Sequence, residues 1–350
     1  GGCPHILAEP QRTNLLTYSE DFSQWTAEES SVSLNTLETL SPDGTNNATI
    51  LTENTALGKH GVTTYITSGG SSYSFSFFAK YKTRQYISIV TSDNVYWQSQ
   101  VVVDLSDGSI TKEYSRSYTT TNKVEDFGNG WYKISSSIEG TYDTRFFSRI
   151  YLSNVAVPLD PPHNSYTGES LSAYIWGAQV EEGTYGTSYI PTSGSTVTRN
   201  QDIFTRDGIS SLINSTEGVL FVEIAALAND GTFRNISLNN GTTGQAVRIY
   251  FRNQANKITV LIGSSSGASV TIDVTDTLSF NKIAFQYKVN DVRVFVNGSL
   301  EGTITSVAMP VGLNELALDV ANNLPFYGKV KQLQVYDTAL TDDTLALLTS

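Results

Sequence analysis

Short runs in which apolar and polar residues alternate one by one recur along almost the whole chain. In "SYSFSFFAKY", residues 72–81, aromatic side chains at 73, 75 and 77 alternate with serines at 72, 74 and 76. A repeat of two residues places successive side chains on opposite faces of a β-strand. Similar runs such as "QYISIVTSD", "WYKISSSIEG" and "SRIYLSNV" follow at short intervals, separated by Gly, Asn and Asp. The pattern predicts an all-β protein built from many short antiparallel strands.

The strand pattern stops once and then begins again, which indicates two domains. The stretch "GTYGTSYIPTSGSTVTRNQD" is rich in Gly, Ser and Thr, and "EGVLFVEIAAL" then starts a second set of alternating runs. A chain of 350 residues is long for one sandwich and sufficient for two cores. We therefore predict two tandem antiparallel β-sandwich (jelly-roll) domains. The expected parts are an N-terminal arm or junction with an upstream segment (1–12), a first domain (13–195), a linker (196–202) and a second domain (203–350).

Two local signals refine the second domain. Asn297 and Gly298 lie between two strand-like runs, and this dipeptide favours a two-residue hairpin. In the tail "TALTDDTLALLTS", Thr341 precedes two acidic residues and an apolar pattern, which is typical of a capped helix start. We expect one short C-terminal helix.

The charge of the chain excludes several kinds of partner. It has 22 Lys and Arg against 34 Asp and Glu, a net charge of −12. Sequence-independent binding of nucleic acid needs clustered cations, so we expect no nucleic-acid partner. No apolar run reaches the roughly 18 residues of a membrane helix, so we expect no membrane insertion. Cys3 is the single cysteine, which leaves no disulfide within the chain.

Three segments of the second half carry a family resemblance. They are "TEGVLFVEI" as an opening strand, "NKIAFQYKVNDVRVFVNGSLEGT" as a hairpin and "FYGKVKQLQVYDTALTDDTLALLTS" as a closing strand and helix. The second half thereby resembles the concanavalin A-like lectin/glucanase superfamily in its laminin G-like form. The resemblance implies a β-sandwich and says little about a ligand.

The first half carries a different resemblance, on "EPQRTNLLTYSEDFSQW", "YSFSFFAKY", "VVVDLSDGSI", "GNGWYKIS" and "YIWGAQVEEGTYGTSYIPT". It is similar to a module of bacteriophage tail and fibre proteins and of large bacterial surface or secreted proteins, which itself resembles jelly-roll carbohydrate-binding modules. The resemblance implies an extracellular or virion-surface protein whose partner is a polysaccharide or a cell-surface glycan.

The sequence lacks the usual machinery for glycan cleavage. Retaining glycosidases need two carboxylates about 5–5.5 Å apart, and the Glu-x-Asp-x-x-Glu strand that supplies them in this superfamily is absent. His5, His60 and His163 lie in loop-like contexts without metal-ligand spacing. We therefore expect no enzymatic activity and no required cofactor, with a divergent polysaccharide lyase or hydrolase as an alternative.

Strand parity defines a candidate ligand face in the first domain. If Ile87 and Ile89 face the core, the residues that alternate with them face outward. The same alternation assigns inward and outward residues in the neighbouring strands. Concave sites hold polar ligands with aromatic rings such as tyrosine beside planar polar groups such as the guanidinium of Arg and the amide of Gln. Trp97 has inward parity but lies near a strand start, where parity is least certain. The predicted carbohydrate-binding residues are Arg84, Tyr86, Tyr96, Trp97, Gln98, Arg149 and Tyr151. An ordinary solvated sheet face is the alternative.

The other three tryptophans are assigned structural roles. Trp131 follows a turn and matches the resemblance as a scaffold residue, and Trp176 alternates with other apolar residues, so both are predicted to be core. Trp25 is predicted to be an edge or staple residue.

A second candidate row lies in "QAVRIYFRN" of the second domain. Apolar residues at 247, 249 and 251 alternate with Arg248, Tyr250 and Arg252. If that face is concave, the row is suited to acidic glycans. The alternative is a solvated sheet face.

Aspartate-rich loops are the candidate metal sites. Calcium prefers several oxygen ligands, and "SPDGTNN" with Asp43 and "DLSDG" with Asp104 and Asp107 supply carboxylates. These loops suggest a structural calcium ion as one interpretation. The alternative is that each loop is an ordinary turn without an ion.

The leading hypothesis is non-catalytic recognition of an extracellular polysaccharide, by part of a phage fibre or of a bacterial surface or secreted protein, with the first sandwich as the preferred binding module. The alternative is a structural virion or spacer protein that binds no glycan. Because single modules bind glycans weakly and multivalency compensates, we expect a homo-oligomer, a trimer if the protein is a fibre.

Overall fold

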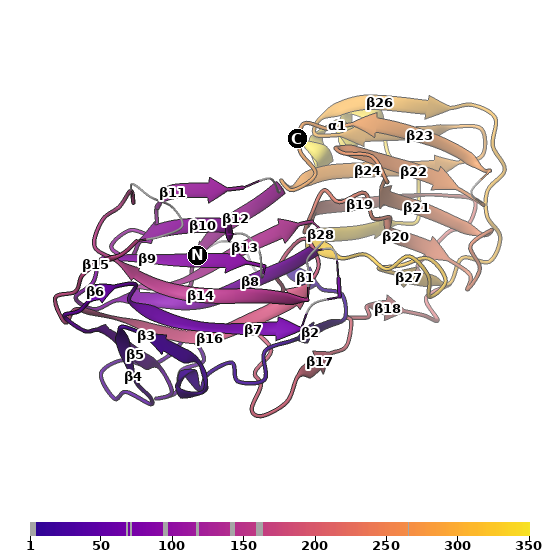
Figure 1. Cartoon of the computed structure of the whole chain (residues 1–350). Coiled ribbons are helices and arrows are strands. Elements are labelled where there is room, and N and C mark those ends of the chain that lie inside the picture. The colour runs from indigo at the N-terminus through magenta and orange to yellow at the C-terminus, as the bar shows by residue number, and fades with distance from the viewer. Residues whose placement is uncertain are drawn as a thin grey trace. The chain divides into compact units, whose positions relative to one another are not determined.

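The computed structural model describes residues 5–67, 69–70, 72–93, 97–116, 119–140, 144–158, 164–264 and 266–350 (Figure 1). The chain forms two compact units, which are residues 11–200 and residues 1–10 with 201–350. Both units consist of antiparallel sheets that pack as sandwiches, and one short helix, α1 (Asp342–Thr349), ends the chain. The predicted all-β class with a C-terminal helix is confirmed.

The first domain, residues 11–200, contains two six-stranded sheets. The β9 sheet has the order β11 (Ile110–Ser115), β10 (Trp97–Asp104), β9 (Tyr86–Ser92), β14 (Arg145–Ser153), β7 (Gly61–Thr67) and β3 (Thr26–Glu28). The β8 sheet has the order β12 (Thr119–Asp126), β13 (Trp131–Glu139), β8 (Ser72–Tyr81), β16 (Ser172–Glu182), β5 (Thr49–Glu53) and β4 (Ser30–Ser33). Smaller elements are the pair β6 (Leu57–Gly58) with β15 (Tyr166–Thr167), the pair β2 (Arg12–Asn14) with β17 (Val197–Arg199), and the 3-10 turn η1 (Phe22–Gln24).

The core of the first domain lies between these sheets and follows the alternation read from the sequence. Phe75 and Phe77 of β8 pack with Ile87 and Ile89 of β9 in one buried cluster. Trp25 also belongs to this cluster and is 7% exposed, so it is a core residue and not the edge residue predicted.

A second buried cluster covers the opposite face of the β8 sheet. Trp131 and Trp176 pack there with Phe78 and Tyr174. The indole N–H of Trp131 donates to the carbonyl oxygen of Leu40 at 2.8 Å, which ties the loop before β5 to this face. Both tryptophans are buried as predicted, although outside the space between the two sheets.

The string "YIWGAQVEEGTYGTSYIPT" is joined to the start of the first domain by hydrogen bonds of Asn14. Asn14 is fully buried, and its amide donates to the carbonyl oxygens of Ala178 and Ile190 at 3.2 and 2.8 Å. Its side-chain oxygen accepts from the backbone N–H groups of Leu16 and Val180 at 3.2 and 3.1 Å. One asparagine thus links the start of the domain to β16 and to the segment that follows it.

The second domain also contains two six-stranded sheets. The β19 sheet has the order β1 (Ile6–Ala8), β28 (Gly328–Tyr336), β19 (Glu217–Ala226), β24 (Asn281–Lys288), β25 (Val292–Val296) and β26 (Ser299–Ile304). The β21 sheet has the order β18 (Thr205–Arg206), β27 (Glu315–Ala317), β20 (Arg234–Asn239), β21 (Ala246–Phe251), β22 (Lys257–Ile262) and β23 (Ala268–Asp273).

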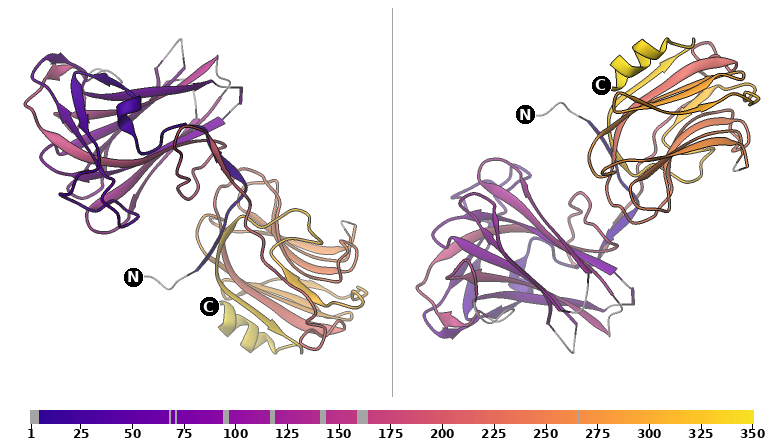
Figure 2. Two further views of the ribbon diagram at one scale, coloured as in Figure 1. Left: turned by 90° about the horizontal axis from the view of Figure 1, so that it is seen from below. Right: turned by 90° about the horizontal axis from the view of Figure 1, so that it is seen from above.

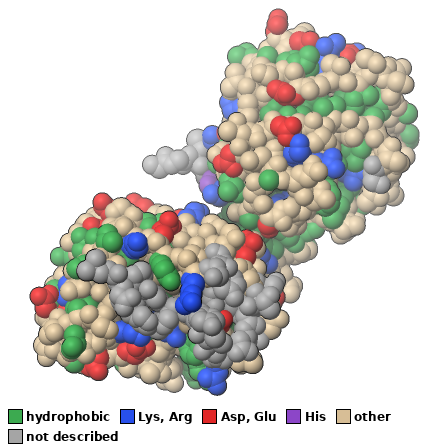
Figure 3. Space-filling view, turned by 45° about the horizontal axis from the view of Figure 1, so that its top comes forward, with side chains coloured by type: hydrophobic (Ala, Val, Ile, Leu, Met, Phe, Trp, Pro, Cys, Tyr) green, Lys and Arg blue, Asp and Glu red, His purple; other side chains and the backbone are tan. Residues whose placement is uncertain are grey.

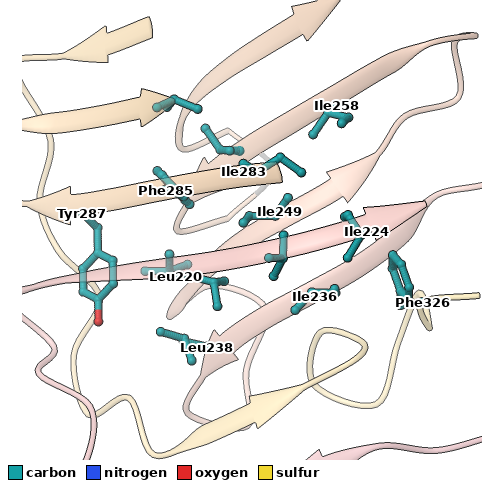
Figure 4. Close-up of a cluster of buried hydrophobic side chains, with 14 of the residues drawn as sticks. Leu220, Ile224, Ile236, Leu238, Ile249, Ile258, Ile283, Phe285, Tyr287 and Phe326 are labelled. Carbon is teal, nitrogen blue, oxygen red and sulfur yellow. The ribbon is translucent and has the colours of Figure 1, made fainter. Parts of the chain in front are cut away.

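Branched aliphatic side chains from both sheets fill the space between them. Figure 4 shows Leu220 and Ile224 of β19 facing Ile236 and Ile249 of the β21 sheet. Helix α1 packs on the opposite face of the β19 sheet, where Leu345 is fully buried beside other apolar residues (Figure 2). The β21 sheet is therefore the one whose outer face this helix leaves uncovered.

The expected N-terminal arm is instead a strand of the second domain. Ile6–Ala8 pairs with β28 in the register Ile6 to Val330 and Ala8 to Gly328. Ala8 is fully buried, and the backbone N–H of Glu9 donates to the carboxylate of Asp202 at 2.9 Å. The strand has only three residues and its partner follows more than three hundred residues later, so no local pattern announces it.

The expected linker is likewise part of a ribbon. Val197–Arg199 forms β17 and pairs with Arg12–Asn14 of β2 within the first domain. The chain therefore enters and leaves the first domain on two neighbouring strands, and the first domain is inserted into the second after residue 10.

The two local signals in the second domain are confirmed. Asn297 and Gly298 have φ angles of 48° and 89° between β25 and β26, as a two-residue hairpin with left-handed residues requires. The hydroxyl of Thr341 accepts from the backbone N–H of Thr344 and so caps α1. No helix in the described part of the chain has the length and hydrophobicity needed to cross a membrane.

Candidate functional site

The outer face of the β21 sheet carries the row predicted for the second domain. Val247, Ile249 and Phe251 lie in the core, so the pleat of β21 turns Arg248 and Tyr250 to the outer face. The pairing places Tyr250 between Asn235 and Thr259, and Arg248 between Ser237 and Leu261. The row thus lies in the middle of a six-stranded sheet.

Arg248 differs from the other buried arginines of the described chain. It is only 6% exposed, as is Arg84, and Arg234 is 2% exposed. Arg84 pairs with Glu53 and Arg234 pairs with Asp230 at 2.7 Å. Within the described ranges, Arg248 has no carboxylate partner, and its Nη2 donates to the carbonyl oxygen of Gly263 at 2.7 Å. Its Nε has no acceptor, which is also true of the Nε of Arg234. Burial lowers the pKa of Arg248, and the electrostatic interaction with the nearby Tyr250 acts in the opposite direction.

A guanidinium in a protein stays charged, and a buried charge normally has a counter-charge. The guanidinium of Arg248 therefore presents planar donors, including the unused Nε–H, and has no anionic partner among the described residues.

The rest of the row is more open. Tyr250 and Arg252 are half-buried. Phe233 lies 5.9 Å from Tyr250, centroid to centroid, and Arg252 Nη1 donates to the hydroxyl of Thr271 at 3.0 Å. The three predicted residues of the second domain are thus brought together, with a buried cation at one end and a half-buried ring at its side.

Polar side chains of β20 extend this face. They were not among the candidate residues predicted from the sequence. Ser237 and Asn239 are fully buried; the amide of Asn239 donates to the Ser237 hydroxyl and to Glu315, both at 2.9 Å. The Ser237 hydroxyl donates to the carbonyl oxygen of Asp319 at 2.7 Å. The alternation in "RNISLNN" is the signal that predicts their parity. These side chains satisfy one another's hydrogen bonds, whereas Arg248 has no side-chain partner among the described residues.

Charges of both signs are mixed on the face of the second domain that Figure 3 shows. In Figure 3, acidic and basic side chains are interspersed over the visible face of the second domain, without a large patch of one sign.

The residues predicted for the first domain are only partly brought together. Strands β10, β9 and β14 are neighbours, so the assumption that they share a sheet is confirmed. Tyr86, Arg149 and Tyr151 have outward parity on it, since Ile87, Ile150 and Leu152 lie in the core. Tyr96 lies outside the described residues, and for Trp97 and Gln98 only the backbone of β10 is described.

Arg84 does not lie on this face, so the position predicted for its side chain is wrong. It precedes β9 in a turn, and its guanidinium binds both oxygens of Glu53, whose side chain is fully buried. The hydroxyl of Tyr166 donates to the same carboxylate at 2.6 Å, and the backbone N–H of Glu169 does so at 2.8 Å. Burial alone would raise the pKa of Glu53, but these hydrogen bonds, with Arg84 first, hold it below its ordinary value. The cluster stabilises the fold.

Tyr151 is also unsuited to stack on a ligand, because it is 3% exposed. Its hydroxyl donates to Glu28 at 2.8 Å, and its burial raises its pKa. Arg149 is half-buried; its Nη1 donates to the hydroxyl of Ser92 at 2.6 Å, and its guanidinium lies 4.6 Å from the ring of Phe147. Tyr86 is half-buried.

The predicted calcium ligands are engaged in their own turns. Asp43 accepts hydrogen bonds from Ser41 and Thr45, at 2.6 and 2.9 Å, and these hold its pKa low although its partial burial acts in the opposite direction. Asp104 accepts from Ser106, and Asp107 from Ser109. Across the described ranges, no group of three His, Cys, Asp or Glu side chains is placed to hold a metal ion. The structural calcium ion considered from the sequence stays a prediction.

Comparison with solved structures finds partial similarity to several proteins. The carbohydrate-binding module of the Ruminococcus gnavus IT-sialidase, solved with α2,3-sialyllactose, is 17% identical; the match covers 42% of this chain and 98% of that chain, with a TM-score of 0.35. The leech intramolecular trans-sialidase is 19% identical over 39% of this chain and 23% of that chain, with a TM-score of 0.33. Domains LG4-5 of the mouse laminin α1 chain are 10% identical over 96% of this chain and 90% of that chain, with a TM-score of 0.27.

No curated protein sequence matches the chain. The second domain has a family match in sequence, which agrees with the resemblance predicted for it. Residues 220–346, from β19 into α1, match the family model of the concanavalin A-like lectin/glucanases superfamily.

Proposed function

We propose that the protein binds acidic glycans, without a catalytic step, through the outer face of the β21 sheet around Arg248 and Tyr250. The observation that carries the proposal is the buried guanidinium of Arg248, which has no carboxylate partner among the described residues. A carboxylate or sulfate of a sugar would supply the missing charge, and the Tyr250 ring would lie beside the sugar ring. The lectin-like family of residues 220–346 supports this class of ligand.

The proposal includes a setting for this function. Binding of a polysaccharide places the protein outside the cell, on a bacterial surface or on a virion, which the resemblance of the first half suggests. Because a single shallow face binds weakly, we also propose a homo-oligomer, a trimer in the case of a fibre.

A glycan array and affinity-gel screen of the purified protein tests the function. The panel contains sialylated, uronate-containing, sulfated and neutral glycans, each with and without EDTA. We expect retention by an acidic class, and EDTA sensitivity would implicate calcium. Arg248→Gln should weaken that retention about 10- to 100-fold, because a hydrogen bond to a charged group is lost.

Arg206→Gln is the matched control, since Arg206 is an exposed arginine on β18 of the same sheet. It should retain the glycan like the unmodified protein. Equal retention by the Arg248 variant, or no retention of any glycan by folded protein, would contradict the proposal and favour a structural role.

Thermal unfolding of the same variants separates a ligand-binding arginine from a structural one. Replacing a buried charge that has no counter-charge should leave the melting temperature of Arg248→Gln unchanged or raise it. Arg234→Gln removes the partner of Asp230 and should lower the melting temperature. A large loss of stability in the Arg248 variant would indicate a structural arginine.

A further inference from the structure

A cleft of about 420 Å³ opens in the first domain beside strand β7. It is lined by residues 15–18, by residues 24–25, by residues 64–67 of β7 and by Thr196. The edge strand β3 pairs only with residues 61–63 of β7, so the next four residues of β7 have no strand on their outer side within the described sheet. The cleft occupies the place where the sheet edge is left open.

The floor of the cleft is apolar and held in place. Leu16, Trp25 and Ile66 are 3%, 7% and 7% exposed and belong to the core cluster. The indole N–H of Trp25 donates to the carbonyl oxygen of Tyr18 at 3.1 Å. The hydrogen bonds of Asn14 fix the backbone just before the lining segment. The floor is therefore formed before any ligand arrives.

An exposed aromatic ring stands at the cleft. Tyr65 is 48% exposed, the guanidinium of Arg145 lies 4.4 Å from its ring centroid, and the ring of Phe147 lies at 5.4 Å. These contacts restrict the ring while leaving part of it open. A restrained tyrosine combines an apolar body with a hydroxyl, which suits the binding of a polar ring.

The polar groups of the cleft are uncharged and mostly unused. Every described side chain that lines it is neutral. The hydroxyls of its four threonines (Thr17, Thr64, Thr67 and Thr196) make no hydrogen bond within the described chain. The amide of Gln24 makes one contact, to Asp21 at 3.4 Å.

We propose that this cleft is a second binding site, for a neutral pyranose unit of an oligosaccharide. The apolar C–H face of the sugar would contact the aromatic and aliphatic surface, and its hydroxyls would pair with the threonines and Gln24. The volume lies within the range of about 300–1,000 Å³ typical of small-molecule sites. A neutral ligand is favoured because every residue that lines the cleft is uncharged. The site does not depend on the acidic-glycan site around Arg248, since its residues and its ligand charge are different.

Saturation-transfer NMR and calorimetry on the full chain test the site. The probes are maltotetraose, cellotetraose, xylotetraose and mannotetraose. We expect at least one of them to bind, and Tyr65→Ala to weaken it about tenfold or more. Thr67→Val, which keeps the shape of the side chain and removes its hydroxyl, should also weaken binding.

Tyr81→Ala is the matched control, because Tyr81 is a tyrosine of the same domain with 46% exposure and does not line the cleft. It and Arg248→Gln should bind the neutral probe normally, whereas Tyr65→Ala should leave acidic-glycan retention intact. Circular dichroism establishes that each variant is folded. Binding of none of the four probes, binding that survives both cleft variants, or a cleft that takes an extended peptide along β7 and no sugar would each overturn the proposal.

Discussion

At the scale of single residues, the buried ion pair of Glu53 and Arg84 makes the first domain sensitive to acid. The hydrogen bonds from Arg84, Tyr166 and Glu169 outweigh the effect of burial and lower the pKa of Glu53 in the folded state. The unfolded chain therefore takes up the proton first as the pH falls. The stability that Glu53 contributes is complete above the ordinary glutamate pKa of about 4.3 and is lost as the pH falls through the lower folded-state value.

Glu53→Gln tests this pair. At pH 7 it should destabilise the first domain by about 3 kcal/mol, because the buried Arg84 guanidinium keeps only the exposed carboxylate of Glu169, at 3.1 Å, as a counter-charge. Urea unfolding at pH 7, 5 and 3.5 should show the difference from the unmodified protein shrinking toward low pH. Glu125→Gln, which breaks an exposed pair with Lys123, is the control and should change little at any of these pH values. A constant difference at all three pH values would show that Glu53 acts by shape and not by charge.

Asn14 is the second residue whose replacement should be costly. All four hydrogen-bonding positions of its buried amide are used. Asn14→Ala therefore removes the side-chain partner of two backbone N–H groups and two carbonyl oxygens. We expect a loss of about 3 kcal/mol in the free energy of unfolding of the first domain. Chemical denaturation measures it, with the exposed Asn46→Ala as control. A loss below that of the control would mean that water replaces the amide.

At the scale of elements, β16 needs its glycine. The pairing of β16 with β8 shifts register between Trp176 and Gln179, and Gly177 in this bulge has φ of +60°. An added Cβ would lie 3.1 Å from the ring of Phe78. Gly177→Ala therefore combines an unfavourable backbone conformation, about 1–2 kcal/mol, with crowding.

Gly44→Ala separates the two costs of that substitution. Gly44 has φ of +84° with nothing within 4 Å of its Cβ position, so it carries the backbone cost alone. We expect the unfolding midpoint of Gly177→Ala in urea to lie clearly below that of Gly44→Ala. Equal midpoints would show that Phe78 moves aside at no cost.

Strand existence and parity were predictable because they depend on neighbours along the chain. The inward parity of Ile87 and Ile89, the hairpin at Asn297 and the capped helix at Thr341 all follow from local pattern. The position of Arg84 was not predictable, since its partner Glu53 lies 31 residues away on another strand. The same holds for the burial of Tyr151, whose hydroxyl meets Glu28 at a separation of 123 residues.

The candidate sites show the same division. The parity of Arg248 was predictable from its strand. Only the fold shows that Arg248, unlike Arg84 and Arg234, has no carboxylate partner among the described residues. The cleft beside β7 was not predicted from the sequence. It exists because β3 pairs only with residues 61–63 of β7 and leaves residues 64–67 without a neighbouring strand on that side of the described sheet.

At the scale of the whole molecule, the order of the chain is not the order of the domains. The second domain begins with β1 and resumes at residue 201, and the first domain occupies the sequence between. Its two connections are the paired strands β2 and β17. Stability of the second domain therefore depends on residues that precede the first.

Removal of residues 1–9 tests this dependence. β28 would lose its edge partner, the core would lose the fully buried Ala8, and the hydrogen bond from Glu9 to Asp202 would disappear. We expect the free energy of unfolding of the second domain to fall by about 2–3 kcal/mol, as the loss of a few backbone hydrogen bonds and some apolar contact implies. Hydrogen exchange of the β28 amides should quicken, while that of β9 and β14 in the first domain stays the same. Removal of residues 1–4 alone leaves β1 in place and should change neither domain; if it speeds exchange in β28 as much as the longer deletion does, β1 is not the element on which the second domain depends.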